Sequence, residues 1–129
     1  MKKILSISLI FFLFTSCNLK EKLQEISKKL EIINSDLRKQ FNHEKIYSDI
    51  GWGTSEGSNY VEVTFYEFNM DSKNHSELEV LSNKVIQRLV LKNPKFKEKE
   101  FIEIRFTNKQ QSDEINSFTK FRVNFNNEF

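Results

Sequence analysis

The stretch "IYSDIGWGTSEGSNYVEVTFYEF", residues 46–68, decides the fold that we predict for this chain. Its second half alternates, so that Val61, Val63 and Phe65 share one side of an extended segment, and β-branched and aromatic residues favour strands. The first half alternates more weakly, and all three glycines of the chain lie between the two arms. Two alternating arms around a Gly/Ser/Asn cluster predict a β-hairpin.

A second pair of alternating segments, residues 101–106 and 117–126, predicts another hairpin near the C-terminus. The polar connector "TNKQQSDEIN" separates the two segments. The apolar residues that alternate along them are Ile102, Ile104, Phe106, Phe121, Val123 and Phe125. Because each strand keeps one polar face, we expect an antiparallel sheet that is covered on one side only.

Residues 18–42 carry the periodicity of an amphipathic helix. An Asn18-x-x-Glu21 pattern is typical of a helix N-terminus. Apolar residues then recur every three or four positions: Leu19, Leu23, Ile26, Leu30, Ile33, Leu37 and Phe41. This stripe leaves two interpretations open: packing on the protein's own sheet, or a coiled coil through residues 18–42 that would form a homo-oligomer.

A second helix is predicted over residues 77–92. Ser76 and Glu79 form a capping box at its start, and Asn93-Pro94 ends it because the residue before proline avoids helical geometry. The predicted order is therefore α-β-β-α-β-β. The simplest architecture is an α+β domain in which two helices pack on one face of a four-stranded antiparallel sheet.

The first seventeen residues have the composition of an export signal. Lysines at positions 2 and 3 precede the apolar run of residues 4–14, and Thr15 and Ser16 lead to Cys17. A charged start, an apolar run of about 7–15 residues and a small-residue exit are typical of a secretory signal peptide. The run is shorter than the roughly 20 apolar residues that a membrane-spanning helix needs.

Phe14-Thr15-Ser16-Cys17 resembles the lipobox of bacterial lipoproteins, with Phe14 where leucine is most common. The resemblance implies that residues 1–16 are removed and that residues 17–129 form a single small α+β domain beginning at a lipidated Cys17. Asn18, rather than aspartate, then favours the outer membrane, on its periplasmic or surface face. An ordinary secretory signal with an unmodified cysteine, and a retained anchor helix, are the other two interpretations.

The numbers of basic and acidic side chains bear on whether the chain binds nucleic acid. The chain has 20 basic and 18 acidic side chains, but Lys2 and Lys3 would leave with the signal peptide and no acidic residue would. The remaining 18 basic and 18 acidic side chains do not form the basic domain that nucleic-acid binding requires. Cys17 is the only cysteine, so no intramolecular disulfide is available to the domain.

No catalytic residue, metal site or cofactor is predicted. His43 and His75 are the only histidines, and no nucleophile motif surrounds any serine. One histidine among the acids near Asp71 offers too few ligands for zinc. The glycine spacing in "GWGTSEG" lacks the lysine of a phosphate-binding loop, so we interpret this segment as a hairpin tip.

Aromatic residues indicate where a partner would bind. The expected interaction surface consists of Trp52, Tyr60, Tyr66 and Phe68, with Phe101 and Phe118 also turned away from the core side of their strands. A second core layer is the competing interpretation of the same residues. The chain resembles small lipoproteins of Gram-negative envelopes, and we expect a non-enzymatic interaction or structural protein. The alternative is a small ligand-binding or enzymatic domain that uses the Gly-rich hairpin around Trp52 with His75 and Asp71.

Overall fold

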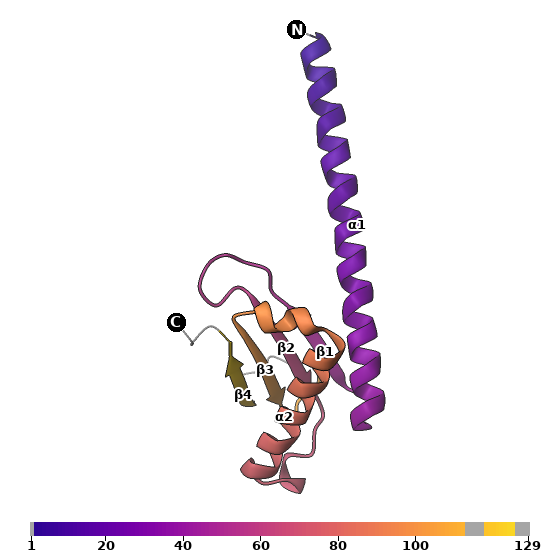
Figure 1. Cartoon of the computed structure of the whole chain (residues 1–129). Coiled ribbons are helices and arrows are strands. Elements are labelled where there is room, and N and C mark those ends of the chain that lie inside the picture. Colours follow the sequence, from indigo (N-terminus) through magenta and orange to yellow (C-terminus); the bar gives the residue numbers. More distant parts are fainter. Residues whose placement is uncertain (1, 113–117, 126–129) are drawn as a thin grey trace. The chain divides into compact units, whose positions relative to one another are not determined.

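The computed structural model describes residues 2–112 and 118–125, and it describes side chains from residue 18 onward. The chain divides into two compact units, Met1–Ile32 and Ile33–Phe129. The backbone of helix α1 (Lys2–Phe41) runs through the point of division (Figure 1). The side chain of Cys17 lies outside the described residues. So do residues 113–117 and 126–129, which include part of the predicted polar connector and both ends of the predicted last strand.

Helix α1 begins earlier than predicted. It starts at Lys2, so Asn18 lies inside the helix instead of capping it, because the apolar residues before it are also compatible with helix. The helix ends at Phe41, where Asn42 adopts a left-handed φ of 50° and the His43 amide donates to the Arg38 carbonyl at 3.2 Å. This is a Schellman-type ending. Among the residues described with side chains, no helix is long and apolar enough to cross a membrane.

The described part of the chain contains one sheet with the strand order β1-β2-β3-β4. The strands are β1 (Ile46–Ile50), β2 (Tyr60–Phe65), β3 (Phe101–Phe106) and β4 (Thr119–Asn124). The α+β class, the order α-β-β-α-β-β and both antiparallel hairpins are confirmed. Two short 3-10 helices, η1 (Met70–Ser72) and η2 (Pro94–Glu98), flank helix α2 (His75–Lys92).

The prediction of a fully antiparallel sheet is wrong, because the central pair β2-β3 is parallel. Val61 pairs with Ile102 and Phe65 pairs with Phe106 in this register. Helix α2 carries the chain from the end of β2 back to the end of the sheet where β2 began, so β3 starts beside the start of β2 (Figure 1). A helical crossover of this kind joins parallel strands.

Helix α2 also begins earlier than predicted. Asn74, rather than Ser76, is the N-cap, and its side-chain oxygen accepts a 2.9 Å hydrogen bond from the Glu77 amide. The predicted end is confirmed: Lys92 is the last helical residue, and the Asn93 amide donates to the Leu89 carbonyl. Proline then opens η2 at its first position.

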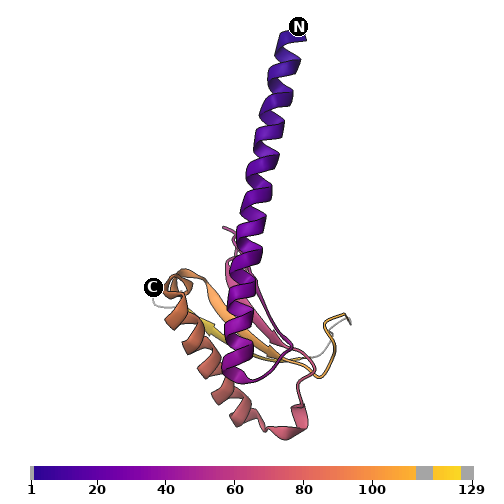
Figure 2. The same ribbon diagram turned by 90° about the vertical axis from the view of Figure 1, so that its right-hand side faces the viewer.

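The core lies between one face of the sheet and two helical segments, α2 and the last turns of α1 (Figure 2). A 2.7 Å ion pair between Asp36 and Arg88 joins these two segments. The most deeply buried apolar side chains are Leu37, Ile46, Val61, Val63, Phe65, Val85, Leu89, Ile102, Ile104 and Phe106. The predicted apolar faces of all the strands but β4 are thus buried, and β4 is only partly covered.

The same turns of α1 cover the outer edge of β1. The Ser48 amide donates to Asn34 Oδ1 at 2.7 Å, and Arg38 Nε donates to the Ile46 carbonyl at 3.0 Å. Edge strands normally leave such backbone groups unpaired. Side chains of α1 therefore make hydrogen bonds to β1 that a neighbouring strand would otherwise make at this edge.

Candidate functional site

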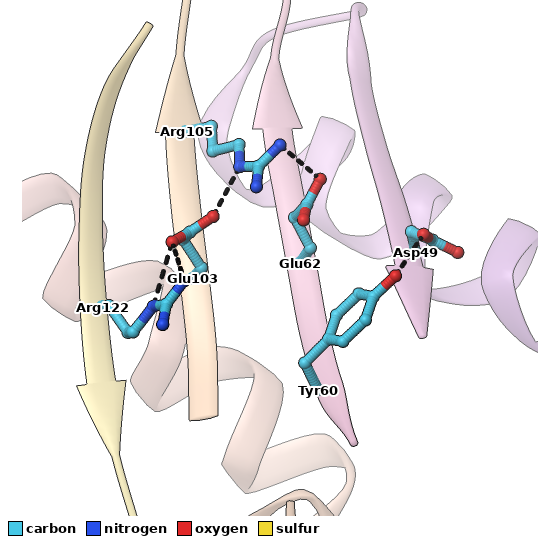
Figure 3. Close-up of polar contacts among 6 residues, drawn as sticks. All are labelled: Asp49, Tyr60, Glu62, Glu103, Arg105 and Arg122. Carbon is cyan, nitrogen blue, oxygen red and sulfur yellow. Dashed lines mark hydrogen bonds and ion pairs between the residues drawn. The ribbon is translucent and has the colours of Figure 1, made fainter. Parts of the chain in front are cut away.

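The face of the sheet turned away from α2 carries charged and aromatic side chains (Figure 3). These residues alternate with the core residues along each strand, so the alternation that builds the core also builds this surface. We call it the charged face. Its members are Tyr47, Asp49, Tyr60, Glu62, Thr64, Phe101, Glu103, Arg105, Lys120, Arg122 and Asn124.

A ladder of ion pairs crosses three strands at the centre of the charged face. Glu103 on β3 has no exposed side-chain area; Arg105 Nε donates to its Oε2, and Arg122 donates to its Oε1 at 2.9–3.0 Å. The Arg105 guanidinium also lies 2.9 Å from Glu62 Oε1 on β2. We call Glu62, Arg105, Glu103 and Arg122 the charge ladder (Figure 3).

The two carboxyl groups of the ladder have pKa values shifted in opposite directions. Burial raises the pKa of Glu62, and the opposing attraction of Arg105 does not cancel this effect. Burial by itself also raises the pKa of Glu103, but the hydrogen bonds and the positive charges of Arg105 and Arg122 together outweigh it, and the net pKa is lowered. Glu103 is therefore held as a carboxylate, whereas the charged form of Glu62 is disfavoured.

Aromatic rings pack around the two arginines. The Arg122 guanidinium lies 3.8 Å from the ring centre of Phe101, and the Tyr60 ring stacks on the same phenylalanine at 5.6 Å. Arg105 lies 4.4 Å from the ring centre of Phe118. Each guanidinium is thus held between a carboxylate and an aromatic ring, an arrangement that cation–π attraction favours.

Tyr60 joins the ladder to the edge strand β1. Its hydroxyl donates to Asp49 Oδ2 at 3.2 Å, and the pKa of Tyr60 is raised by burial first and by the nearby Asp49 charge second. The phenol therefore stays protonated and continues to donate. Of the four aromatic residues predicted as an interaction surface, Tyr60 is the one that lies on the charged face beside the ladder (Figure 3).

The other predicted surface residues lie elsewhere. Tyr66 packs edge-to-face on Tyr47 at 5.8 Å, next to the charged face. Phe68 differs from the prediction, because it packs on the core rings of Phe65 and Phe106 at 5.9 and 5.1 Å. The chain leaves the strand after Phe65, so the strict alternation that placed Phe68 outward no longer applies.

Trp52 is 55% exposed and lies in the loop formed by residues 51–59. Lys99, which is almost fully buried, holds the base of this loop: its Nζ donates to the Gly51 carbonyl at 2.8 Å and to Asn59 Oδ1 at 2.9 Å. The same ammonium lies 4.7 Å from the ring centre of Trp52. Glycine is favoured at position 51, because an added Cβ would lie 2.6 Å from the backbone oxygen of Ser58 and 2.4 Å from the Tyr60 ring.

The three residues of the enzymatic alternative are not brought together. Trp52 lies at the end of the sheet where β2 and β3 begin, whereas Asp71 and His75 follow the end of β2, at the opposite end (Figure 1). The His75 ring packs on Phe121 at 5.0 Å. Among the described residues, no group of three or more histidine, cysteine or acidic side chains is arranged to hold a metal ion.

The chain was compared with protein-family models, with curated proteins and with solved structures, and it matches none of them. A functional assignment therefore depends on the residues themselves.

Proposed function

We propose that this protein is a lipid-anchored, non-enzymatic envelope protein that binds a protein partner. The observation that carries the proposal is the lipobox-like Phe14-Thr15-Ser16-Cys17 directly after the apolar run of residues 4–14. Two or three acyl chains on Cys17 would hold the chain on a leaflet, since one chain alone binds only reversibly. The outer membrane is the proposed site, on its periplasmic or surface face.

The contacts of Glu103 on the charged face and of His43 near the core favour an interaction role over catalysis. A general acid or base must reach a substrate proton, but both oxygens of Glu103 accept from Arg105 or Arg122. His43 Nε2 lies 2.7 Å from the Tyr66 carbonyl, and its ring stacks on Phe65. These titratable groups serve contacts within the fold.

The charged face is the proposed binding surface. Arginine and tyrosine are enriched at protein interfaces, because both offer large contact area together with directed hydrogen bonds. Tyr60 lies on this surface and Tyr66 lies beside it, whereas Trp52 would be a separate contact point on its loop. The side chain of Arg122 is 42% exposed, so part of the ladder is open to a partner.

Replacing Cys17 with alanine tests the anchor. We expect near-complete loss of label when cells are grown with a fatty-acid analogue, because the acylated sulfur is gone. Asn18→Ala is the matched control; it keeps the cysteine and should stay labelled. Label that persists in the Cys17→Ala protein would refute the anchor.

Site-specific photo-crosslinking in intact cells tests the binding surface. A photoreactive residue at Lys120, exposed on the charged face, should give one defined adduct with an envelope protein. The same residue at Gln87, exposed on α2 on the other side of the sheet, should not give that adduct. Identical adduct patterns at the two positions, or none at either, would contradict the assignment of the charged face.

A further inference from the structure

The helical stripe of residues 18–32 is exposed, although the same stripe is buried further along α1. Leu19 and Leu23 are 60% and 58% exposed, and Ile26 and Leu30 are partly exposed. The next members, Ile33 and Leu37, are 5% and 1% exposed and belong to the core of the second unit. The stripe thus changes from uncovered to covered at the boundary between the two units.

Charges are distributed unevenly around this stripe. At about 100° per residue in an α-helix, Lys20, Lys22 and Lys29 lie along its two borders. Lys28 and Glu21 lie on the opposite side of the helix, and Glu25 and Glu31 lie just beyond the lysines on either side. The charged residues next to the apolar face are therefore lysines, and the three acidic residues of the segment lie farther from it.

This arrangement disfavours a second copy as the partner of the stripe. In a heptad pattern with Leu19, Leu23, Ile26 and Leu30 at the a and d positions, the border lysines occupy e and g positions. Lysines at those positions would flank the seam in both copies, and no e or g position between residues 18 and 32 is acidic. A coiled-coil homodimer would thus gain no interhelical ion pairs along this segment.

A leaflet surface matches the same arrangement. An amphipathic helix at a membrane interface buries its apolar face at the headgroup–acyl boundary, while lysines along the borders extend to anionic headgroups. The segment also follows Cys17 directly, so an anchor at that cysteine would hold it within reach of the leaflet. Leu19 would then be the apolar residue closest to the anchor.

We propose that residues 18–32 form an interfacial helix that lies on the leaflet and buries Leu19, Leu23, Ile26 and Leu30 at its surface. The inference rests on the proposed lipid anchor at Cys17. The proposed partner of this helix is an anionic lipid surface. The folded unit begins at Ile33, where the stripe becomes part of the protein core.

Depth-dependent quenching tests this placement. The full chain is produced with Trp52→Phe, so that a tryptophan placed at Leu23 is the only one, and is reconstituted in phosphatidylcholine/phosphatidylglycerol vesicles that contain brominated lipid. We expect emission shifted to the blue and several-fold stronger quenching for Leu23→Trp than for Gln24→Trp. Gln24 is the matched control because it is exposed and lies off the stripe.

The outcomes separate the two proposals. Equal quenching at positions 23 and 24 in protein that carries the fatty-acid label would overturn the interfacial helix and leave the anchor intact. A blue shift without quenching by brominated lipid would also overturn it, since the stripe would then be covered by protein. Absence of the label would overturn the anchor at Cys17, on which the inference rests.

Discussion

Replacing Glu103 with glutamine is expected to lower the free energy of unfolding at pH 7 by about 3 kcal/mol. The substitution removes the negative charge that two guanidinium groups share and leaves Arg105 and Arg122 facing each other across it. Both arginines are partly exposed and regain some hydration, so the loss should lie at the lower end for a broken buried pair. Urea denaturation followed by circular dichroism measures the change.

Glu62→Gln is the matched control on the neighbouring strand. Glu62 pairs with Glu103 in the sheet register and shares Arg105 with it, yet its pKa is raised, which means that the fold disfavours its charged form. Removing that charge should change the free energy of unfolding by less than about 1 kcal/mol. Equal losses in the two variants would show that Glu103 does not hold the ladder together.

The pH dependence should distinguish the same two residues. The pKa of Glu103 is lower in the folded state, so its stabilisation is present above the unfolded pKa near 4.3 and is lost as the pH falls through the folded pKa. Glu62 has the opposite sign: its unfavourable charge is relieved as the pH falls through its raised pKa. Wild type should therefore lose more stability on acidification than Glu103→Gln, whereas Glu62→Gln should lose at least as much as wild type.

Replacing Phe65 with alanine should cost about 4 kcal/mol, the largest loss that we expect from a single substitution in this fold. Phe65 is 1% exposed, and its ring meets those of Phe41, His43, Phe68 and Phe106 at centroid distances between 5.0 and 6.4 Å. Removal of the ring would leave a cavity and delete its contact with Phe41 on α1. Thermal unfolding should show a melting temperature lower by about 15 °C or more.

Trp52→Ala is the control for this second prediction. Trp52 is a larger aromatic residue, but it is 55% exposed and contacts the ammonium of Lys99 on a loop. We expect its removal to change stability by no more than about 1 kcal/mol. If the two variants melt at similar temperatures, the ring cluster around Phe65 does not form the core of the domain.

Much of the fold follows from local patterns in the sequence. Alternation located the four strands to within a few residues, and it assigned the faces of β2 and β3 correctly. Alternation specifies which side of a strand is buried but carries no information about the direction of a neighbour, so the parallel β2-β3 pair was missed. That direction depends on the tertiary position of α2.

Helix boundaries were less well predicted, for a related reason. Asn74-x-x-Glu77 and Ser76-x-x-Glu79 are both acceptable capping patterns, and they overlap. Only the folded chain decides between them, and Asn74 makes the capping hydrogen bond. The end of α2 was predictable because Pro94 excludes continuation of the helix on steric grounds.

The candidate site was predicted only in part. Tyr60 was identified because it alternates with apolar residues of β2. Glu103 was not identified, because a glutamate between two isoleucines in a strand normally faces solvent. Its burial depends on Arg105 from its own strand and Arg122 from β4, which only the register of the sheet brings together. Lys99 was missed for the same reason, because its partners Gly51 and Asn59 lie some forty residues earlier in the chain.

The parallel pairing of β2 with β3 at the middle of the sheet has a consequence for the order in which the chain folds. Each hairpin joins segments that are near in sequence, but pairing β2 with β3 brings together residues as distant as Val61 and Ile102. Closing that longer loop costs more chain entropy, so we expect the hairpins to form early and their union to be the slow step. Until α2 docks, β2 and β3 each present an unpaired strand edge and an uncovered apolar face, and newly made chains would be most prone to aggregate during that interval.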